Sequence, residues 1–325
     1  MESKDQSELC FPQLANLSCS KPPSSWSEGV FWSVLLYFIC VLTVLLNLLV
    51  ITSISHFRQL RTPTNLLLLS LAVCDLLVGL LVWPGEIFLN KSCWTLSDVS
   101  CSLYNFVSFT VTSASVGNMV MMSADRYVAI CNPLQYHVQV TVKRIQLFVC
   151  LCWFSSLLMS SILVKEDLAN PGKYKSCYGE CVIHIDYAAS VFDLVVTFIL
   201  PLCIIVTLYT RVFAVAVSQA RAVRSHVRCG KAPLPMRARK SELKAARTLG
   251  VLVLVFLMCF CPYYCVSLAG DSFPWSASVV LNMYYLNSCV NPLIYVWFYP
   301  WFRRAVKHIV TLQVLQSGSC GANIL

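Results

Sequence analysis

An aspartate inside an apolar stretch is the residue of this sequence with the clearest chemical consequence. Asp193 stands eight residues before Pro201, in the mostly apolar stretch 187–212. A buried carboxylate without a partner is costly or stays protonated. No lysine or arginine lies at that depth in the other apolar stretches, so a cationic ligand would supply the missing charge. The sequence therefore predicts a cation-binding site at Asp193.

Aromatic and hydroxyl side chains at comparable depths in other stretches suit an ammonium ligand. Aromatic faces attract ammonium groups by about 0.5–2 kcal/mol each, although aromatic residues at helical spacing usually fill a core. The predicted site adds Ser108, Phe109, Thr112, Thr197, Phe260, Tyr263, Tyr264, Tyr284 and Tyr285 to Asp193. Glu86 and Asp186 are weaker candidates for binding a second ammonium group. Both could instead be solvated at the mouth of the site.

Further polar residues deep in apolar stretches predict a polar core. Asp75 lies about ten residues into its stretch, and charged groups at such depth are functional candidates. The core is expected to hold water or a sodium ion, or to pack the helices by hydrogen bonds. Its other members are Asn47, Ser115, Asn287 and Asn291.

Two local patterns predict a conformational switch. Asp125-Arg126-Tyr127 ends one apolar stretch and Glu242 precedes another, so Arg126 and Glu242 could pair in an inactive state. A static surface pair, worth about 0–1 kcal/mol, is the alternative.

Pro262 follows Phe256 and Phe260 and kinks its helix, and Asn291-Pro292-Leu293-Ile294-Tyr295 makes a second break. Ordinary membrane prolines would give the same pattern.

The elements that must position these residues are membrane-spanning helices. The chain of 325 residues is 58% hydrophobic and 12% charged, with a mean hydropathy of +0.69, whereas soluble domains are about 25% charged. A spanning helix needs about 20 apolar residues. Seven stretches qualify, namely 31–54, 65–88, 102–126, 146–164, 187–212, 248–269 and 276–299. They predict an all-α seven-helix bundle at 31–300, an outer N-terminal segment at 1–30, and an amphipathic helix with a tail at 301–325.

The charge distribution orients the bundle. With the N-terminus outside, six of the 24 lysines and arginines lie on the outer side and 18 on the inner side. This positive-inside bias accounts for the net charge of +9 by topology and attraction to anionic lipid rather than by nucleic-acid binding. It predicts a multi-pass plasma-membrane protein with an extracellular N-terminus. Asn16 and Asn90 begin outer-side glycosylation sequons.

Six of the 18 cysteines lie on the outer side, which predicts disulfides. Six cysteines allow 15 pairings, among which the sequence alone does not choose. A bond from Cys101 to Cys181 would tie the second outer loop across the bundle mouth. Zinc at Cys177 and Cys181 is a weaker alternative, because a second tight cysteine pair is missing.

The motifs, taken in order, resemble the rhodopsin-like G-protein-coupled receptors. They are Asn47, Leu71 to Asp75, Cys101, Asp125 to Tyr127, Trp153, Pro201 with Tyr209, Phe256 to Pro262, and Asn291 to Tyr295. The resemblance implies a heterotrimeric G protein as partner. On opening, Arg126, Tyr209 and Tyr295 would become exposed to it, and Leu134 would pack against it. Residues 302–309 read as an amphipathic helix on the membrane, and Cys320 is a candidate for palmitoylation.

The segment Asn287 to Phe302 narrows the resemblance to the trace amine-associated receptors. That resemblance implies the disulfides Cys101–Cys181, Cys10–Cys177 and Cys19–Cys93. It also implies a small biogenic or volatile amine as ligand, an olfactory role, and a stimulatory G protein that raises cyclic AMP. Two departures stand out. The family's usual helix-three aspartate is replaced by Ser108, as in some fish members that carry an aspartate on helix five, and Phe260 replaces the usual tryptophan.

Rival functions fit less well. No metal-binding helix or nucleophile motif of an enzyme stands out. A retinal pigment needs a lysine in the last span, and residues 276–299 contain none. A transporter would favour internal repeats, which are missing. The remaining alternative is a receptor of the same fold for a non-amine ligand, in which Asp193 is structural.

Overall fold

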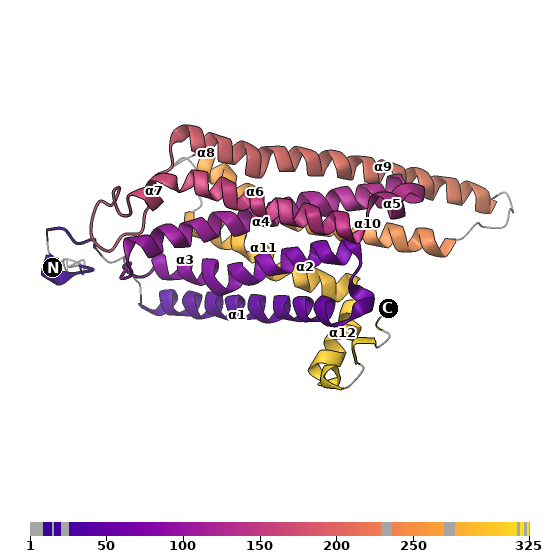
Figure 1. Ribbon diagram of the computed structural model, residues 1–325, viewed down its shortest axis with the longest axis horizontal. Coiled ribbons are helices and arrows are strands. Elements are labelled where there is room, and N and C mark those ends of the chain that lie inside the picture. Colours follow the sequence, from indigo (N-terminus) through magenta and orange to yellow (C-terminus); the bar gives the residue numbers. More distant parts are fainter. Residues whose placement is uncertain are drawn as a thin grey trace.

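The protein folds into a bundle of long helices that run side by side (Figure 1). The computed structural model describes residues 9–14, 16–20, 26–228, 236–269, 277–316, 319–321 and 324. The side chains of 26–29, 216, 219–228, 236–249, 269, 277 and 315 lie outside the described part.

Each predicted span corresponds to one helical segment, and most of the bounds agree to within a few residues. The exceptions are the fifth helix, which continues to Arg228 although its span was predicted to end at 212, and the sixth, which begins at Met236 although its span was predicted to begin at 248. The first four segments are α1 (Trp26–His56), α2 (Pro63–Leu77) continued by α3 (Trp83–Leu89), α4 (Asp98–Cys131) and α6 (Val142–Leu163). The last three are α8 (Tyr187–Asp193) continued by α9 (Leu200–Arg228), α10 (Met236–Ala269) and α11 (Ala277–Phe298). Short helices α5 (Pro133–Gln139) and α7 (Lys165–Ala169) lie in connections, and α12 (Pro300–Val310) follows the bundle. The all-α prediction is confirmed.

Five of these segments are long and apolar enough to cross a membrane by their own composition: Val30–His56, Pro63–Leu89, Val142–Leu163, Tyr187–Val215 and Gly250–Leu268. Helices α4 and α11 are more polar. Helix α4 can contain more polar residues because it packs against α2, α6, α9 and α10, so little of its surface is left to face lipid. Helix α11 packs against α1, α2 and α10.

Buried polar side chains join the helices of the core. Asn291 on α11 donates to the Asp75 carboxylate on α2 at 2.9 Å, and Asn47 on α1 donates to the main-chain carbonyl of Ser288 at 3.1 Å. The Trp153 indole donates to Ser70 at 3.1 Å. Such bonds are worth about 0.6–2 kcal/mol each in a membrane. They fix the mutual rotation of α1, α2, α6 and α11.

Two spans contain a π-helical turn. One is Val78–Val82, between α2 and α3, and the other is η4 (Leu194–Ile199), between α8 and α9. A π turn inserts extra backbone into a helix and is frequent at functional sites. In the second case it begins directly after Asp193, so it changes which way that residue faces relative to the rest of the span.

Three disulfides lie at one end of the bundle, called here the disulfide end; the opposite end is the Arg126 end. The bond Cys101–Cys181 is formed, as the family resemblance implied. The other two implied pairings are wrong, because the structure joins Cys10 to Cys93 and Cys19 to Cys177.

The main chain of the N-terminal segment explains that exchange. Cys19 N donates to Tyr178 O at 2.9 Å, and Tyr178 N donates to Leu17 O at 2.7 Å, so the segment from Leu17 to Cys19 runs beside Cys177. Cys10 contacts Gly179. Gly179 has a φ of +106°, a backbone conformation that glycine adopts without strain. A Cβ on Gly179 would lie 2.8 Å from the Cys10 Cβ. The spacing of the cysteines in the sequence does not show which N-terminal cysteine lies next to Cys93 and which lies next to Cys177.

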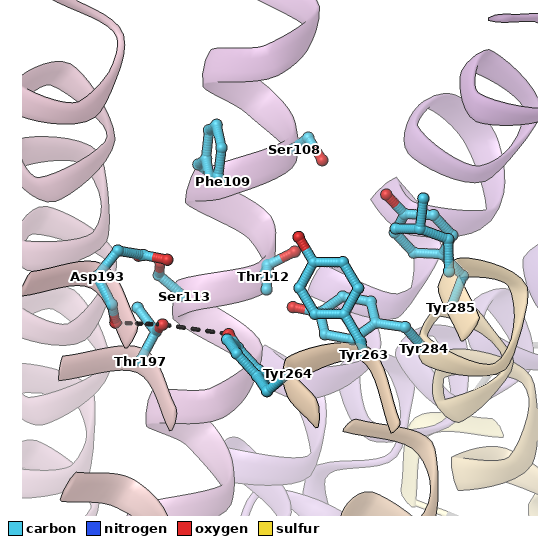
Figure 2. Close-up of a pocket in the computed structure, with 11 residues that line it drawn as sticks. Ser108, Phe109, Thr112, Ser113, Asp193, Thr197, Tyr263, Tyr264, Tyr284 and Tyr285 are labelled. Carbon is cyan, nitrogen blue, oxygen red and sulfur yellow. Dashed lines mark hydrogen bonds between the residues drawn. The ribbon is translucent and has the colours of Figure 1, made fainter. Parts of the chain in front are cut away.

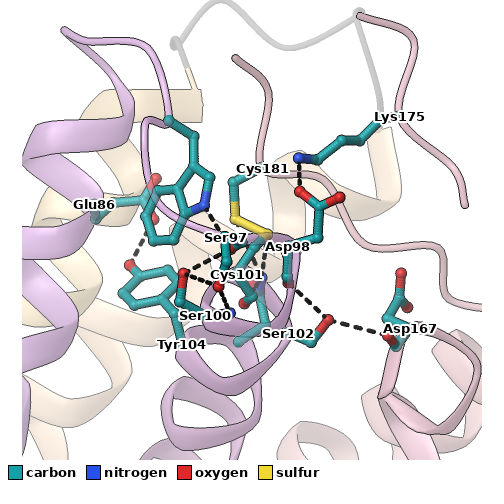
Figure 3. Close-up of a disulfide and its surroundings, with 12 residues drawn as sticks. Glu86, Ser97, Asp98, Ser100, Cys101, Ser102, Tyr104, Asp167, Lys175 and Cys181 are labelled. Atoms are coloured by element: carbon teal, nitrogen blue, oxygen red, sulfur yellow. Dashed lines mark hydrogen bonds and ion pairs between the residues drawn. A yellow bond between two sulfur atoms is a disulfide. The ribbon is translucent and has the colours of Figure 1, made fainter. Parts of the chain in front are cut away.

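Polar contacts hold the second outer loop onto the start of α4 (Figure 3). Lys175 pairs with Asp98, and the Ser102 hydroxyl donates to the main-chain carbonyl of Asp167 at 3.1 Å. The Asp167 carboxylate accepts from His184 N at 3.3 Å. Burial raises the pKa of Asp167, and the bond from His184 opposes that rise. The loop is therefore fixed by ion pairing and hydrogen bonding as well as by Cys101–Cys181.

The predicted amphipathic helix is present as α12. Trp301, Phe302 and Ala305 are buried against the bundle, whereas Arg303 and Arg304 are exposed. Cys320 lies in a later turn and is half-buried. Its palmitoylation stays a prediction.

Candidate functional site

A small cavity of about 60 Å³ lies between α4, the α8–η4 junction, α10 and α11. Its lining consists of Ser108, Phe109, Thr112, Ser113, Asp193, Thr197, Tyr263, Tyr264, Leu281, Tyr284 and Tyr285 (Figure 2). Nine of the ten residues predicted around Asp193, itself included, contribute to it. The cavity brings together residues from four spans that are far apart in the sequence.

Asp193 supplies the single charged group of this lining. Its carboxylate is half-buried, and no lysine, arginine or histidine side chain in the described part lies within 4.0 Å of it. The adjacent turn is held by Thr197, whose hydroxyl donates to the main-chain carbonyl of Asp193 at 2.6 Å. A cationic group entering the cavity would meet a carboxylate that no cationic side chain among the described residues pairs with.

Aromatic rings form the wall next to Asp193. Tyr264 stacks on Phe198 at a centroid distance of 4.1 Å and meets Tyr263 edge-on at 5.2 Å. The ring centroids of Tyr263 and Tyr284 lie 5.1 Å apart. These contacts fix the ring orientations, so their faces and hydroxyls are preorganised around the cavity.

Phe260 does not line the cavity. It is 3% exposed, with ring centroids 4.2 Å from both Phe256 and Tyr284. Of these two neighbours, Tyr284 lines the cavity. The sequence indicated the depth of Phe260 along its helix, but it could not show that Tyr284, on another helix, would line the cavity next to it.

Glu86 and Asp186 also lie outside the lining. Glu86 accepts from the Asn90 amide at 3.1 Å and lies 3.3 Å from the Tyr104 hydroxyl. Asp186 precedes α8 and its side chain is 60% exposed, with His184 at 3.9 Å. The exposure of Asp186 therefore favours the alternative that this side chain is solvated at the mouth over a role in the cavity.

Two lining residues were not predicted. Ser113 follows Thr112 on α4, and Leu281 precedes Tyr284 by one helical turn on α11. The second could have been found, because residues three apart share a helix face. Ser113 reaches the cavity because the site spans a broad face of α4.

The predicted polar core is buried at the centre of the bundle. Asp75, Ser115, Asn287 and Asn291 are each at most 5% exposed. One oxygen of Asp75 accepts from Asn291, while its other oxygen and the amide oxygens of Asn287 and Asn291 have no hydrogen-bond partner among the described residues. Carboxylate and amide oxygens are the ligands that a hard cation prefers. This donor set fits a sodium ion, whose binding stays a prediction.

At the Arg126 end, Arg126 is held by neighbours on α2 and α4. Its Nε donates to Asp125 at 2.9 Å, and it also bonds Thr64. The Tyr136 hydroxyl on α5 donates to Asp125 at 2.9 Å. The side chain of Glu242 lies outside the described residues, so the predicted Arg126–Glu242 pair is untested.

The other residues predicted to act in the switch occupy different environments. Phe256 and Tyr295 are 1% exposed, whereas Tyr127 and Tyr209 are half-buried. Pro262 and Pro292 both lie inside helices, as predicted. Leu134 on α5 is 96% exposed, an unusual position for an apolar side chain.

The two sequons lie at the disulfide end. Asn16 is exposed, and Asn90 is exposed but its amide donates to Glu86. Their glycosylation stays a prediction.

Comparison with known proteins identifies the family. Residues 46–295 match the model of the 7 transmembrane receptor (rhodopsin family). The chain is 34% identical to trace amine-associated receptor 13c of Danio rerio, over 98% of this chain and 97% of the relative. It is 32% identical to trace amine-associated receptor 1 of Macaca mulatta, over 94% and 95% respectively. It is 34% identical to trace amine-associated receptor 7e of Rattus norvegicus, over 98% and 92%. The chain is therefore a multi-pass membrane receptor, not an enzyme, and belongs to the trace amine-associated receptors of the rhodopsin family of G-protein-coupled receptors.

Proposed function

We propose that this receptor detects a small amine, whose ammonium group binds the Asp193 carboxylate. The observation that supports this most strongly is the half-buried carboxylate in a tyrosine-rich cavity, without a cationic side chain beside it in the described part. A charge-assisted hydrogen bond there contributes about 1.5–3 kcal/mol. Adjacent tyrosine faces add about 0.5–2 kcal/mol each.

The size and charge of the cavity favour a ligand with one ammonium group. The lining holds one carboxylate, and the other candidates, Glu86 and Asp186, lie outside it. A volume of about 60 Å³ suits a small ligand unless side chains move aside. An olfactory role, which the family resemblance implied, is part of this proposal.

The Arg126 end is proposed to bind a stimulatory G protein and to raise cyclic AMP. The disulfide end then faces the outside of the cell, because disulfides form in oxidising compartments. The exposed Leu134 provides an apolar contact for that partner. Movement of α10 about Pro262 would open the face that contains Arg126, Tyr209 and Tyr295.

A sodium ion at Asp75 is proposed as a second ligand of the bundle. Three buried oxygens there, on Asp75, Asn287 and Asn291, have no partner among the described residues. A cation would offset the cost of burying the Asp75 charge.

A receptor for a non-amine ligand is the alternative, and ligand charge separates the two. Cells expressing the receptor are exposed to primary amines and to alcohols and carboxylic acids of the same carbon skeleton, with cyclic AMP as the readout. Responses limited to the amines support the proposal. An alcohol or acid that acts as potently as its matched amine contradicts it.

A further inference from the structure

We infer that the Arg126 end of α1, the turn η2 (Arg58–Leu60) that follows it, and α12 form a docking surface for the chain's own C-terminal segment, and that the docked segment favours the closed bundle. The segment comprises residues 319–324. This inference concerns regulation rather than ligand recognition. It rests on the proposed function in one respect, because it takes the Arg126 end as the face that opens toward a G protein.

The closest contact of this segment with the bundle is made by Ile324. Its side chain is 0% exposed and belongs to the same apolar cluster as Phe57 and Leu60. Its main-chain N–H donates to the Gln59 side chain at 3.4 Å, and its carbonyl accepts from Arg304 Nη1 at 3.3 Å. Apolar burial favours such a contact, and bonded main-chain groups avoid its usual cost. The surface therefore has the properties of a formed binding site for this residue.

A second contact lies at the turn η7 (Ser319–Gly321), which packs against η2. The Ser319 hydroxyl lies 3.0 Å from His56 Nε2, at the end of α1. The same hydroxyl donates to the Val314 carbonyl at 2.7 Å. A serine has one hydrogen, so His56 is the donor and Ser319 the acceptor in the contact between them. The segment is thus held at two separate points.

The turn that leads the chain back from α12 supports a docked segment. Leu312 has a φ of +57°, in the left-handed region that a leucine rarely adopts. Such a conformation persists where the surrounding structure holds it in place. Helix α12 precedes this turn, and the docked residues Ser319 and Ile324 follow it. Figure 1 shows the C-terminus beside α12, near the end of the bundle.

Helix α12 is also fixed to the end of α11. Arg303 Nη1 donates to the carbonyls of Val296 and Trp297 at 2.8 and 3.0 Å, at the C-terminus of α11. Phe302 is 0% exposed, and its ring centroid lies 6.4 Å from that of Tyr295. Tyr295 is among the residues that opening of the bundle is proposed to expose. Displacement of Tyr295 would therefore displace α12 as well.

The docked segment opposes that displacement because it bridges two parts of the bundle. His56 and Gln59 belong to α1 and η2, whereas Arg304 belongs to α12. In the arrangement described here, Arg126 is bonded to Asp125 and the bundle is closed. A contact that forms in one of two states shifts the equilibrium toward that state. Loss of the docked segment should therefore favour opening.

Hydrogen–deuterium exchange of the full-length receptor in lipid nanodiscs tests the docking. Ile324→Asp places a charge in the buried site and should make the main-chain amides of 301–310 exchange at least about three-fold faster, the effect of losing one hydrogen bond. Gln316→Asp is the matched control, because it adds the same charge at an exposed position of the same segment of chain. It should leave exchange unchanged. Unchanged exchange in Ile324→Asp would overturn the inference.

Basal signalling tests the consequence of docking. GTP exchange is measured without ligand on stimulatory heterotrimers and on heterotrimers of the other classes, at equal concentrations of folded receptor. We expect Ile324→Asp to raise the rate at least about two-fold through a population shift, and Gln316→Asp to leave it unchanged. General destabilisation would lower the rate instead. Faster amide exchange without faster GTP exchange on any heterotrimer would overturn the regulatory role.

A third variant separates docking from lipid attachment. Cys320 lies between the two docked residues and is a candidate for palmitoylation. Cys320→Ser should behave as the wild type in both measurements. If it reproduces the effects of Ile324→Asp, a lipid anchor holds α12 and the inference is overturned. Neither measurement uses a ligand, so failure of the proposed function, seen as no response to any amine or an unaffected response in Asp193→Asn, is recognised separately.

Discussion

The Thr197 hydroxyl bridges the helix of Asp193 and helix α10, donating at 2.6 Å to the Asp193 carbonyl and lying 3.2 Å from the Tyr264 hydroxyl. It does so from the π turn that follows Asp193. This bridge ties the proposed anchor to the helix that contains Pro262. If a ligand binds Asp193 as proposed, this bridge would connect its binding to α10.

Replacing Thr197 with valine tests that connection. Thr197→Val keeps the shape but removes both contacts, so agonist potency should fall roughly 2- to 12-fold, the effect of about 0.5–1.5 kcal/mol. Thr210→Val is the matched control, since exposed Thr210 makes the same type of bond to Val206 at 2.7 Å. The measurement is a cyclic AMP dose–response. Equal effects of the two substitutions would show that the bridge has no specific role.

The disulfide pairing is open to direct measurement. Proteolysis without reduction, followed by mass spectrometry, should yield linked peptides containing Cys10 with Cys93 and Cys19 with Cys177. The pair substitution Cys10→Ser with Cys93→Ser should leave no new reactive thiol outside the bundle. Cys10→Ser with Cys177→Ser should leave two, labelled by an impermeant maleimide. A peptide linking Cys10 to Cys177 would contradict the structure.

Phe260 should not tolerate the larger tryptophan that is usual in the family. It is 3% exposed between Phe256 and Tyr284, and overpacking a core costs about 1–3 kcal/mol. Phe260→Trp should lower the Tm of the purified receptor, and adding Tyr284→Leu should restore part of the loss. Phe154→Trp, at a position 65% exposed, should have little effect. An unchanged Tm for Phe260→Trp would mean that the packing is looser than described.

Sodium should stabilise the wild-type receptor through Asp75. A ligand present at ten to a hundred times its Kd stabilises the native state by roughly 1.4–2.7 kcal/mol. The Tm should therefore be higher in sodium chloride than in N-methylglucamine chloride at equal ionic strength. Asp75→Asn should remove the difference, and Asp186→Asn should keep it. A sodium effect that survives Asp75→Asn would place the ion elsewhere.

The helices could be predicted because lipid restricts a spanning segment to one backbone form. Hydropathy located α4 and α11 as well, although both are polar, since polar groups on a helix packed against several others need not face lipid. The two π turns were not predicted. A π turn after Asp193 depends on how that helix packs, and the residues Leu194 to Ile199 are ordinary apolar helix formers.

The cavity was largely predictable because depth along a helix can be read from the sequence. Asp193, Tyr263 and Tyr284 were placed at one level by counting residues from the prolines and from Asn291. Rotation about each helix axis could not be read as well, which is why Phe260 was included and Ser113 was missed. The exchange of two disulfide partners depended on the path of the N-terminal segment, which is set by main-chain bonds such as Cys19 to Tyr178.

The central claim is that Asp193 holds the ligand ammonium. Its most direct test is a cyclic AMP dose–response to a panel of amines, comparing the wild type with Asp193→Asn, Asp193→Ala and the control Asp186→Asn at matched surface expression. We expect any active amine to lose at least ten-fold in potency, roughly 1.4 kcal/mol or more, in both Asp193 variants and to be little affected in Asp186→Asn. Wild-type potency in both Asp193 variants would contradict the claim and make Asp193 a structural residue.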